Sequence, residues 1–525
     1  MELAQALLAL DAGTTSVKAG LFSPDGHCFG VGRQEYQLET PTADRAQLDP
    51  EVYWQACLKT VHEVIELSGA KPEQVKALAV SSQGETTITL DAQGKAIYPA
   101  LVWLDNRASS QAAFLVKRFG KEVYSRTGIP EIVPTWSACK IMWIRQNEPE
   151  VFARAHKFLL VQDYLIYRLT GRIVTDGSIS CTTLNYDIVK NTWWADVQDA
   201  IGIRTEQLPE IVQPGTNVGT LSQEAAQQLG LTTKTCVVTG GMDQAVGAIG
   251  AGNFEPGKIS ETTGAALAIQ ATISDPMIDQ SKVVPVYYHS VPGQYLLVPV
   301  CPTAGMAFKW FRDAFFQDEI KEAEKENMDA YDRLTQLAQS VPAGSEGLIM
   351  LPHLMGAFSP EPNLLARGSF TGFTLKHTRG HFVRALLEGV AFLLKLNLEY
   401  IERTGIFIHE IRSAGGGARS LLWNQIKANV CNRPVVTLVN EETALLGDAI
   451  LAGVASGIFR SINEGCDSMV VVKESIQPNG DAEVYLEPYR LYCDLDHQLS
   501  DYFKRGYFTS PGSPLKGGRE RIISN

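Results

Sequence analysis

Two stretches of this chain, about half its length apart, share a layout that constrains the fold more than any other feature. They are LALDAGTTSVKAG, residues 8–20, and GKISETTGAALAIQA, residues 257–271. In each, an apolar run stops at a short segment rich in glycine, threonine or serine and then resumes. This pattern is typical of two strands joined by a tight turn. Because it occurs twice, the sequence predicts an α/β chain made of two similarly built halves.

The length of the chain agrees with this division, because 525 residues exceed what one hydrophobic core usually supports. We expect an N-terminal domain at 1–252, a C-terminal domain at 253–490 and a C-terminal extension at 491–525. From Thr509 onward the extension lacks apolar periodicity, so its end is expected to be mobile.

The composition argues against several classes of protein. The 58 acidic and 46 basic residues give a net charge of −12, which disfavours a nucleic-acid partner because phosphate-binding surfaces are basic. Nine cysteines without a C-x-x-C pair indicate reduced thiols and no structural zinc site. No run reaches the roughly 18 apolar residues of a membrane span, and the first residues lack a signal-peptide pattern. The sequence therefore predicts a cytoplasmic protein without a membrane partner. A homodimer is expected because two-fold dimers are the commonest oligomers.

Other segments have clear periodicity. We expect a three-stranded antiparallel meander in residues 6–38 and a helix between Asp49-Pro50 and Gly69. Further helices are expected over 318–340 and 379–405. A strand followed by a helix is expected in residues 157–171 and again in TCVVTGGMDQAVGAIGAG, where the helix opens at Asp243.

The turn at Gly13-Thr14-Thr15 offers backbone N–H groups and two hydroxyls, which together suit an anion. A plain tight turn is the alternative. Asp11, just before the turn, is placed to bind hydrated Mg²⁺, which takes few carboxylates and keeps water and phosphate oxygens. Lys18 can neutralise phosphate charge. The phosphate loop G-x-x-x-x-G-K-[ST] is absent.

A second hairpin and a triple glycine extend this interpretation. The hairpin at Thr262-Thr263-Gly264 is expected to contact the same phosphates from the other half. Gly415-Gly416-Gly417 precedes a predicted helix, and the missing side chains would let a flat nucleoside approach the backbone and the helix dipole. A strand–helix loop of no special role is the alternative. Together these segments predict a nucleoside triphosphate held between two halves.

Asp243, in TGGMDQAVG, is the candidate for chemistry. Gly240 and Gly241 would let a substrate come close to the backbone, and the carboxylate follows where a strand ends and a helix begins. One interpretation is structural, with Asp243 as the N-cap of that helix. The other is a base that accepts a hydroxyl proton while a γ-phosphoryl group is transferred in line.

With these residues in place, the chain resembles the FGGY carbohydrate kinases over roughly residues 7–460. The resemblance implies a pair of actin-like (RNase H-like) domains flanking an ATP cleft, with Mg²⁺ as cofactor and a small sugar or polyol as substrate. Five segments carry it in order: the first turn, SACKIMWIRQN (137–147), TGGMDQ (239–244), GSFTGFTLKHTRGHFVRALLE (368–388) and SAGGGARSLLWNQIKANV (413–430).

By this resemblance Asp243 is the catalytic base, and Asp11 binds the metal. The residues implied on the phosphate and nucleotide sides are Thr14, Thr15, Lys18, Thr263, Gly264, Gly305, Gly416, Gly417 and Ser420. The chain departs from the family at Ala265, where members often have a threonine or serine that contacts phosphate. Thr262 or Thr263 can substitute for it.

The segments SSQGETTITLD (81–91) and ALVWLDNRA (100–108) resemble the glycerol-kinase form most closely. They imply that the residues on the sugar side are Gln83, Glu85, Trp103 and Asn106, together with Asp243. For Trp103, a core aromatic beneath the site is the alternative.

The same region departs from the glycerol-kinase form in two places. Gly84 stands where an arginine is expected, and Thr135-Trp136 replaces a Tyr-Phe pair. Losing a guanidinium and a phenol removes hydroxyl-binding donors and enlarges the site. The Met-His pair of the xylulose-kinase form is also missing after Gln83. The sequence therefore favours a four- or five-carbon polyol or a ketopentose, with glycerol as the alternative. A second class of function, a non-catalytic actin-like nucleotide-binding switch, also stays open.

Overall fold

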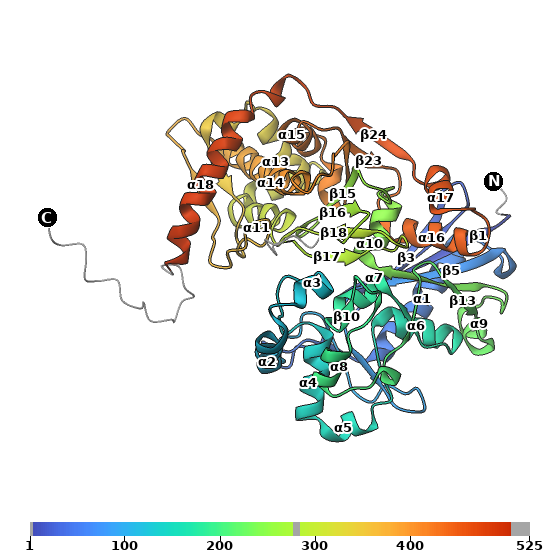
Figure 1. Ribbon diagram of the computed structural model, residues 1–525. Helices are drawn as coiled ribbons and strands as arrows, with labels where there is room; N and C mark the ends of the chain where they lie inside the picture. The colour runs from blue at the N-terminus through green and yellow to red at the C-terminus, as the bar shows by residue number, and fades with distance from the viewer. Residues whose placement is uncertain (1–3, 277–283, 506–525) are drawn as a thin grey trace. The chain divides into compact units, whose positions relative to one another are not determined.

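The computed structural model describes residues 4–276 and 284–505 (Figure 1). The chain forms two compact units. Unit 1 comprises Met1–Ser260, Gln270–Val298 and Leu438–Lys473, and unit 2 comprises Glu261–Ile269, Pro299–Thr437 and Glu474–Asn525. The chain therefore returns twice to unit 1 after first leaving it. The expected mobile end from Thr509 lies outside the described residues.

Unit 1 is built on a six-stranded sheet with strand order β13-β14-β5-β1-β2-β3. β1, β2 and β3 form the expected antiparallel meander, whereas β5 and β14 run parallel to β1 and to each other. β13 pairs with β14 in antiparallel fashion. The strands are β1 (Ala6–Ala12), β2 (Ser16–Phe22), β3 (Cys28–Glu35), β5 (Val75–Ser82), β13 (Asn217–Thr220) and β14 (Cys236–Met242).

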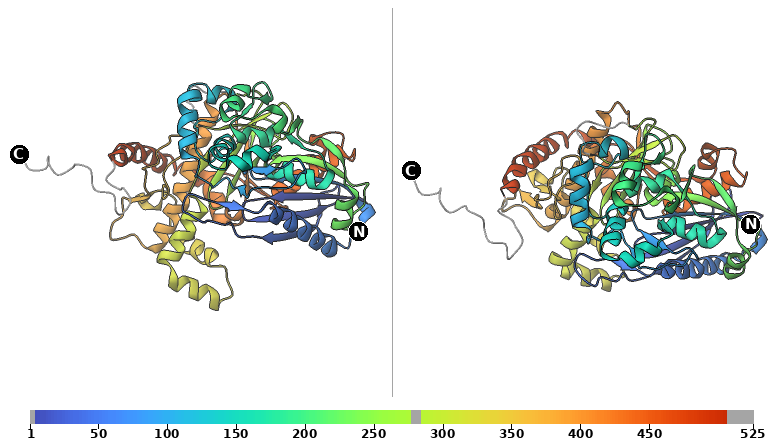
Figure 2. Two further views of the ribbon diagram at one scale, coloured as in Figure 1. Left: turned by 90° about the horizontal axis from the view of Figure 1, so that it is seen from below. Right: turned by 60° about the horizontal axis from the view of Figure 1, so that its bottom comes forward.

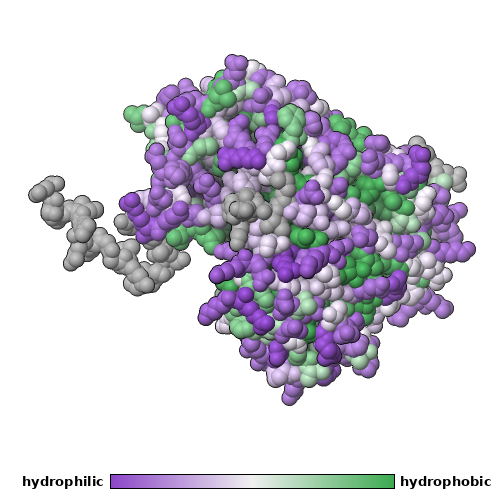
Figure 3. All heavy atoms as spheres, viewed as in Figure 1, coloured by the Kyte–Doolittle hydropathy of each residue, from purple (hydrophilic) through white to green (hydrophobic). Residues whose placement is uncertain are grey.

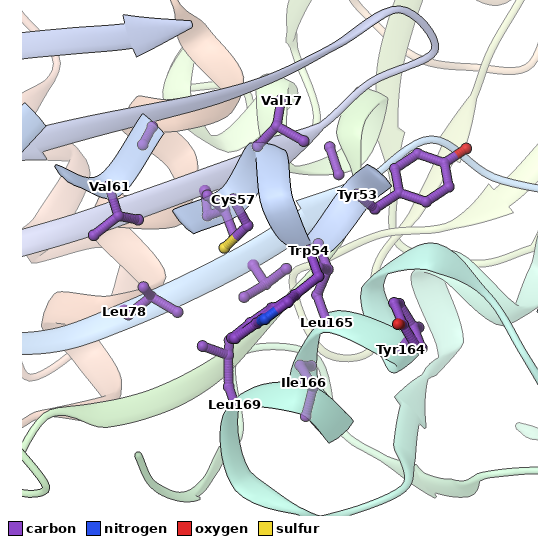
Figure 4. Packing of buried hydrophobic residues seen from close by; sticks show 14 of the residues in the cluster. Val17, Tyr53, Trp54, Cys57, Val61, Leu78, Tyr164, Leu165, Ile166 and Leu169 are labelled. Carbon is purple, nitrogen blue, oxygen red and sulfur yellow. The ribbon is translucent and has the colours of Figure 1, made fainter. Parts of the chain in front are cut away.

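One face of this sheet is covered by α1 (Pro50–Ser68), α6 (Val161–Thr170) and α9 (Gln223–Leu229). Alternate residues of a strand point to opposite faces, so Leu8 and Leu10 of β1 enter this core. Figure 4 shows Trp54 of α1 beside side chains of α6 in the same cluster. Both views of Figure 2 show α1 running alongside the strands of the sheet.

The opposite face of the sheet buries Leu7 and Ala9 of β1 in a second core. This core is formed with α10 (Asp243–Gly250) and α16 (Thr443–Ala455). α10 and α16 cross closely: a Cβ at Gly250 would lie 1.8 Å from the Thr443 carbonyl oxygen, and one at Gly447 would lie 2.0 Å from that of Val246. Only glycine permits this separation of the two helices.

Helix α1 begins and ends where the sequence predicts. Asp49 is its N-cap, and the carboxylate accepts a hydrogen bond from the Glu51 amide at 2.9 Å. Pro50 occupies the first turn, where its missing N–H has no partner to lose. Gly69 ends the helix in the left-handed conformation with φ 62°. The expected strand–helix unit at 157–171 is also confirmed, as β8 (Lys157–Leu159) and α6.

The rest of unit 1 is a largely helical layer with its own core, which includes Leu115, Trp136, Trp143 and Trp194. Its main elements are β6 (Ile88–Leu90), β7 (Ala100–Leu101), α2 (Ser109–Phe119), α3 (Val123–Thr127), α4 (Ser137–Asn147), α5 (Pro149–Arg154), α7 (Gly177–Ser180) and α8 (Ala195–Ile201). From the two returns of the chain come β17 (Val286–Tyr288), β18 (Tyr295–Leu297) and α17 (Ile462–Met469).

In unit 2 the second predicted hairpin is present as β15 (Lys258–Thr263) and β16 (Leu267–Ile273), both of which cross the unit boundary. β22 (Glu410–Ala414) pairs in parallel with β23 (Val435–Leu438). The other main elements are β19 (Val300–Cys301), α11 (Gly305–Phe315), α12 (Gln317–Lys325), α13 (Ala330–Gln339), β20 (Ile349–Leu351), β21 (Ser369–Thr371), α14 (Arg379–Glu402), α15 (Leu421–Cys431), β24 (Val472–Ile476) and α18 (Leu486–Lys504).

The expected single helix over 318–340 is wrong, whereas α14 is confirmed. Two helices, α12 and α13, occupy that segment. Between them Asn327 adopts a left-handed φ of 52°, and Asp329 caps α13 by accepting a hydrogen bond from the Tyr331 amide at 2.7 Å. The aspartate cap was a local signal for the break.

No helix within 4–276 and 284–505 combines the length and apolar character that a bilayer crossing demands. Hydrophilic side chains predominate on the face drawn in Figure 3, and the apolar ones form small groups.

The close crossing of α10 and α16 can be tested with two glycines of the same helix. We expect Gly250→Ala to lower the free energy of unfolding by about 2 kcal/mol or more, because the methyl group meets a backbone carbonyl. Gly247→Ala is the control: its Cβ would have its nearest neighbour at 3.5 Å, so we expect no loss, or a gain of up to about 1 kcal/mol. Urea titration measures both, and equal effects would contradict the crossing.

Candidate active site

Three parallel strands of unit 1 end at the same level. In the sheet register Asp11 of β1 and Gly241 of β14 both lie opposite Ser81 of β5. The residues that follow, Glu85 after β5 and Asp243 after β14, therefore leave the sheet at one edge. The carboxyl ends of parallel strands are where α/β proteins bind ligands.

The Asp11 carboxylate is held at this edge by its neighbours. It accepts a hydrogen bond from the Ser81 hydroxyl at 3.1 Å, and it lies opposite Lys18 in the β1–β2 ladder. Burial raises the pKa of Asp11 above its ordinary value, while the charge of Lys18 and the Ser81 hydrogen bond oppose this rise. In its ionised form, a single carboxylate at a strand end can hold a hydrated divalent cation.

The turn that follows Asp11 is closed by a hydrogen bond from the Gly13 amide to the Ser16 carbonyl at 3.0 Å. Thr14 accepts a hydrogen bond from the indole Nε1 of Trp103 at 2.8 Å, and Thr15 is exposed. The Lys18 ammonium forms an ion pair with Glu442 at 2.5 Å. The turn thus places the Thr14 hydroxyl and the Lys18 ammonium on the segment that follows Asp11, each with a partner within unit 1.

Asp243 is not the N-cap of α10. Met242 takes that place, and Asp243 is the first residue of the helix. Its carboxylate accepts a hydrogen bond from the Gln244 amide at 2.6 Å. The capping interpretation is therefore wrong. Burial and the nearby carboxylates of Asp11 and Glu85 together raise the pKa of Asp243 to about 8, against the opposing hydrogen bond from the Gln244 amide. A carboxyl with this pKa is matched to proton transfer near neutral pH.

The loop that carries Asp243 is fixed by buried polar groups. The Gln162 side-chain oxygen accepts a hydrogen bond from the Gly241 amide at 2.5 Å, and the Ser178 hydroxyl accepts one from the Met242 amide at 3.2 Å. Protein atoms fill the space beside both glycines. A Cβ at Gly240 would lie 2.6 Å from the Val80 carbonyl oxygen, and one at Gly241 would overlap Ser178. The two glycines are needed for internal packing, and not for the substrate approach that the sequence suggested.

Glu85 is held in a strained conformation, with φ 55°. Its amide donates to the Thr182 hydroxyl at 3.1 Å, and its carbonyl accepts a hydrogen bond from the Ser137 hydroxyl at 2.9 Å. Burial raises the pKa of the Glu85 carboxyl to about 7, and the charge of Lys140 opposes this rise. A Cβ at Gly84 would lie 2.8 Å from the Thr182 side chain. Thr182 therefore lies beside the backbone of Gly84, the position at which the glycerol-kinase form has an arginine.

The other residues expected on the sugar side differ in exposure. Gln83 is 3% exposed and donates to the Tyr53 hydroxyl at 3.0 Å. Trp103 is 38% exposed, so the alternative of a core aromatic is wrong. Asn106 is exposed, and its amide donates to the Leu104 carbonyl at 2.9 Å. Within the described residues, the Asn106 side chain bonds the Leu104 carbonyl and not the carboxylates at the strand ends.

Asp448 of α16 is a buried acid that the sequence analysis missed. The Ser81 hydroxyl that bonds Asp11 also contacts the Asp448 carboxyl at 2.7 Å. Asp448 is 0% exposed, and burial raises its pKa well above the ordinary value. Ser81 therefore links the two acids, one from β1 and one from a helix more than 400 residues later. A lone aspartate in the apolar run TALLGDAILAG was the available signal.

Unit 2 contains a pocket of about 540 Å³, a volume typical of small-molecule sites. Six residues expected to bind the nucleotide line it: Thr263, Gly264, Gly305, Gly416, Gly417 and Ser420. The sequence analysis missed most of its walls, which include Met306, Phe308, Tyr331, Arg419 and Trp423. Phe308 contacts the rings of both Tyr331 and Trp423. Apolar and aromatic walls with a glycine-rich floor suit a flat base and its ribose.

The four glycines of this pocket divide into two kinds. A Cβ at Gly305 would lie 2.2 Å from the Gly264 carbonyl oxygen, and one at Gly417 would lie 2.6 Å from the Thr263 methyl. At Gly264 and Gly416 nothing lies within 4 Å. The first two glycines are therefore needed for packing, and the second two leave open space in the pocket.

Four details of the predicted phosphate and nucleotide segments come from the structure. The Thr263 hydroxyl donates to Glu261 at 2.6 Å, so its proton is engaged within unit 2. Gly416 and Gly417 begin a one-turn 3₁₀ helix, Gly416–Arg419, which precedes α15. Ser420 is the N-cap of α15, where its hydroxyl accepts a hydrogen bond from the Trp423 amide at 3.3 Å. At the tip of the hairpin the Ala265 carbonyl accepts hydrogen bonds from two amides before and within α11.

Within the described part of the chain, no group of three or more histidine, cysteine, aspartate or glutamate side chains has the geometry of a metal site. Mg²⁺ commonly binds one or two carboxylates and completes its shell with water and phosphate oxygens. Asp11, with its carboxylate bonded by Ser81, meets that requirement.

Comparisons with known proteins agree with this geometry. Residues 6–250 match the N-terminal domain, and residues 260–456 the C-terminal domain, of the FGGY family of carbohydrate kinases. A xylulose kinase of Bacillus subtilis is 29% identical over 94% of this chain and 97% of its own length. A gluconokinase of the same organism is 30% identical over 96% and 99%. The crystal structure of a ligand-bound xylulose kinase from Lactobacillus acidophilus superposes with a TM-score of 0.87 at 27% identity, over 96% of this chain and 100% of that one.

The fold and the acidic strand ends define a two-domain phosphotransferase of the actin-like (ribonuclease H-like) class. The chain belongs to the FGGY family of carbohydrate kinases. It is an ATP-dependent kinase that acts on a hydroxyl group of a small sugar or polyol. This result removes the non-catalytic switch that the sequence left open.

The raised pKa of Asp243 predicts a pH-dependent cost in stability. Between the ordinary pKa of 3.8 and the folded value of about 8, the folded protein binds more protons at this carboxyl than the unfolded chain. The contribution of Asp243 to stability therefore falls as pH rises through this window.

We expect Asp243→Asn to be more stable than the wild type by about 1 kcal/mol or more at pH 8, and the difference to shrink toward pH 5. Urea unfolding at several pH values measures it. Asp199→Asn, at an exposed position of α8, is the control and should show no such trend. A difference that is constant with pH would contradict the raised pKa.

The open space at Gly416 gives a test of the pocket in unit 2. We expect Gly416→Leu to raise the dissociation constant of ADP by about tenfold or more without a loss of thermal stability, because the side chain enters the pocket. Isothermal titration and a melting curve measure both. Gly480→Leu, at an exposed position with nothing within 4 Å, is the control. Unchanged ADP affinity in Gly416→Leu would rule out the pocket as the nucleotide site.

Proposed function

We propose that this enzyme transfers the γ-phosphoryl group of ATP to a hydroxyl of a ketopentose or a four- or five-carbon polyol, with Asp243 as the base. The observation that carries the proposal is the position of Asp243. It follows β14 at the edge of the sheet where Asp11 lies near the end of β1, and its pKa is raised to about 8 by burial and by the nearby carboxylates of Asp11 and Glu85.

In unit 1 we assign separate roles to the two sides of Asp243. Glu85, Gln83, Trp103 and Asn106 bind the sugar hydroxyls. The Asp243 carboxylate accepts the proton of the reacting hydroxyl as the new O–P bond forms and the bond to ADP breaks. Because phosphoryl transfer needs mainly positioning and charge stabilisation, a rigidly held carboxylate is sufficient for this role.

On the phosphate side of Asp243 we assign the turn after β1. Thr14 and Thr15 offer hydroxyl and backbone donors, and Lys18 supplies a positive charge. Asp11 would hold Mg²⁺, which when bound neutralises phosphate charge during the transfer. The hydrogen bond from Ser81 keeps the Asp11 carboxylate oriented for this task.

In unit 2 we assign the pocket to the adenosine part of ATP. Its walls support this assignment, because Phe308, Tyr331 and Trp423 offer aromatic surface to a base. Gly264 and Gly416 leave room for the nucleotide, and Gly305, Gly417 and Ser420 line the same space. For Thr263 we propose a backbone contact to phosphate, since its hydroxyl proton is engaged by Glu261.

The choice of acceptor follows from the relatives and from residue 84. Relatives of nearly equal length are named xylulose kinase and gluconokinase. Gly84 lacks the arginine of the glycerol-kinase form, and Thr182 lies beside it. Both features favour a ketopentose such as xylulose. Glycerol and gluconate are the alternatives.

We also propose a domain division, an oligomeric state and a cellular location. Residues 1–252 would supply the sugar and phosphate side, residues 253–490 the nucleotide side, and 491–525 an extension. Within 253–490, the segments Gln270–Val298 and Leu438–Lys473 fold with unit 1. We also propose a homodimer in the cytoplasm, which gel filtration with light scattering and cell fractionation would test.

A coupled assay of ADP release tests the function, with xylulose, ribulose, gluconate, erythritol and glycerol as acceptors. We expect stimulation by a ketopentose, with glycerol a poor acceptor. Asp243→Asn should lower kcat by about a thousandfold or more, whereas its dissociation constant for ADP should stay within about twofold of the wild type. Near-wild-type turnover in this variant would show that Asp243 is not the base, and a basal ATPase unaffected by every acceptor would contradict the kinase assignment.

A further inference from the structure

Among the residues that the structure describes, two lysines are fully buried, one in each unit. Lys140 of α4 and Lys427 of α15 are both 0% exposed. Burial of an ammonium group is costly unless all of its N–H groups are bonded. Each of these lysines has three acceptors within hydrogen-bond distance, and in each case the acceptors come from segments that carry expected ligand contacts.

In unit 1 the Lys140 ammonium donates to three backbone carbonyls. They belong to Val102 at 2.8 Å, Glu85 at 3.2 Å and Leu101 at 3.3 Å. The first and third lie directly before Trp103. A single side chain thus ties the segment that ends in Glu85 to the segment that begins at Trp103.

The Glu85 backbone needs this support because of its conformation. A left-handed φ of 55° is unfavourable for a residue with a side chain and persists only where the surroundings enforce it. Lys140 and Ser137, both from α4, bond the Glu85 carbonyl, and Thr182 bonds its amide. The direction of the Glu85 side chain is therefore set by these three residues.

In unit 2 the Lys427 ammonium has three side-chain partners. They are the Glu261 carboxylate at 2.6 Å, the Thr263 hydroxyl at 2.9 Å and the Ser413 hydroxyl at 3.4 Å. The ammonium also lies 5.2 Å from the ring centre of Trp423, which lines the pocket. Glu261 is 0% exposed as well, so the ion pair is entirely internal.

The partners of Lys427 also lie at the ends of two strands. Thr263 ends β15 and precedes Gly264, and Ser413 lies near the end of β22, just before the triple glycine. The two segments touch: a Cβ at Gly417 would lie 2.6 Å from the Thr263 methyl. Lys427 therefore holds together the two glycine-bearing segments that form the floor of the pocket.

We propose that these two lysines are positioning residues for separate ligands: Lys140 orients the sugar-binding segments of unit 1, and Lys427 orients the nucleotide-binding segments of unit 2. This inference rests on the proposed function, since it takes the ligand of each unit from there. Neither lysine touches a substrate.

The choice of lysine over an apolar residue supports a positioning role. Apolar side chains of similar volume stabilise a core at least as well as a buried charge. An ammonium group adds directed hydrogen bonds that fix the backbone and side chains around it. Both lysines form these hydrogen bonds with segments that carry proposed ligand contacts, and not with the surrounding helices.

The experiment compares Lys140→Met with Lys427→Met in the full-length enzyme. Three quantities are measured: the KM and kcat for xylulose, or for the acceptor that the assay identifies, and the dissociation constant of ADP by isothermal titration. We expect Lys140→Met to raise the acceptor KM by about tenfold or more and to leave ADP binding within about twofold. We expect the reverse pattern for Lys427→Met. Lys76→Met, which removes a surface lysine bonded to the Glu73 carbonyl, is the control and should change neither.

A pH profile separates positioning from a general loss of structure. The charge of Lys140 lowers the pKa of Glu85, which is about 7. Its removal should therefore raise that pKa, and carboxyl ¹³C NMR titration of the Glu85 side chain in the wild type and in Lys140→Met measures the change. A merely structural role for Lys140 would lower activity without this shift.

If a methionine variant does not fold, variants that remove a single hydrogen bond test the same inference. Ser137→Ala removes one bond to the Glu85 carbonyl, and Ser413→Ala removes a bond to Glu261. Each should shift the affinity of its own unit's ligand by about threefold or more and leave the other ligand unaffected. The pair Glu261→Gln and Lys427→Met removes both charges of this buried ion pair together.

Equal changes of both ligands in both variants, or no change in the ligand of the same unit, would overturn the inference. Failure of the proposed function is distinguishable. If no acceptor stimulates the wild type, the sugar assignment fails and the role of Lys140 fails with it, while ADP binding still decides the role of Lys427.

Discussion

The register of three parallel strands is the constraint on which the site of unit 1 depends. β1, β5 and β14 are aligned so that Asp11 and Gly241 lie at the level of Ser81. A shift of two residues in any of them would move a carboxylate several ångströms along the sheet. The register is maintained because the strands are buried on both faces, so that slippage by one residue would exchange the two cores. Catalytic geometry and core packing are thus set by one alignment.

Close approaches of backbone segments also fix the positions of the site residues. Glycines at 240, 241, 250, 305, 417 and 447 each lie where a Cβ would overlap protein atoms. Several of them are in segments that resemble ligand-binding motifs, yet protein atoms occupy the space beside them. Only Gly264 and Gly416 leave open room in the pocket. A glycine-rich motif in this chain therefore combines residues needed for packing with residues that make room for a ligand.

The sequence predicted the parts of the site that are local in the chain. The hairpin after Asp11, the strand–helix junction at Asp243 and the glycines near residue 416 are recognisable because turn chemistry and periodicity coincide there. The partners of these residues were missed, because Thr182, Lys140, Asp448 and Lys427 come from distant segments. One signal did exist. Lys140 and Asp448 are lone charged residues within apolar helical runs, a pattern that indicates a buried group with a specific partner. The prediction of one helix over 318–340 was wrong for another reason. Its helical periodicity continues across a break that only a capping aspartate marks.

The late return of the chain to unit 1 has a consequence for biosynthesis. α16 begins at Thr443, whereas the last strand of the sheet that it covers ends at Met242. About 200 residues separate them, which at about 5–20 residues per second means that translation continues for about 10–40 s before α16 is made. Throughout that interval the sheet face that includes Leu7, Ala9 and Val238 lacks its α16 cover. The nascent N-terminal half therefore exposes apolar surface during that interval, which raises its risk of aggregation. This exposure follows from chain connectivity and not from the stability of the finished enzyme.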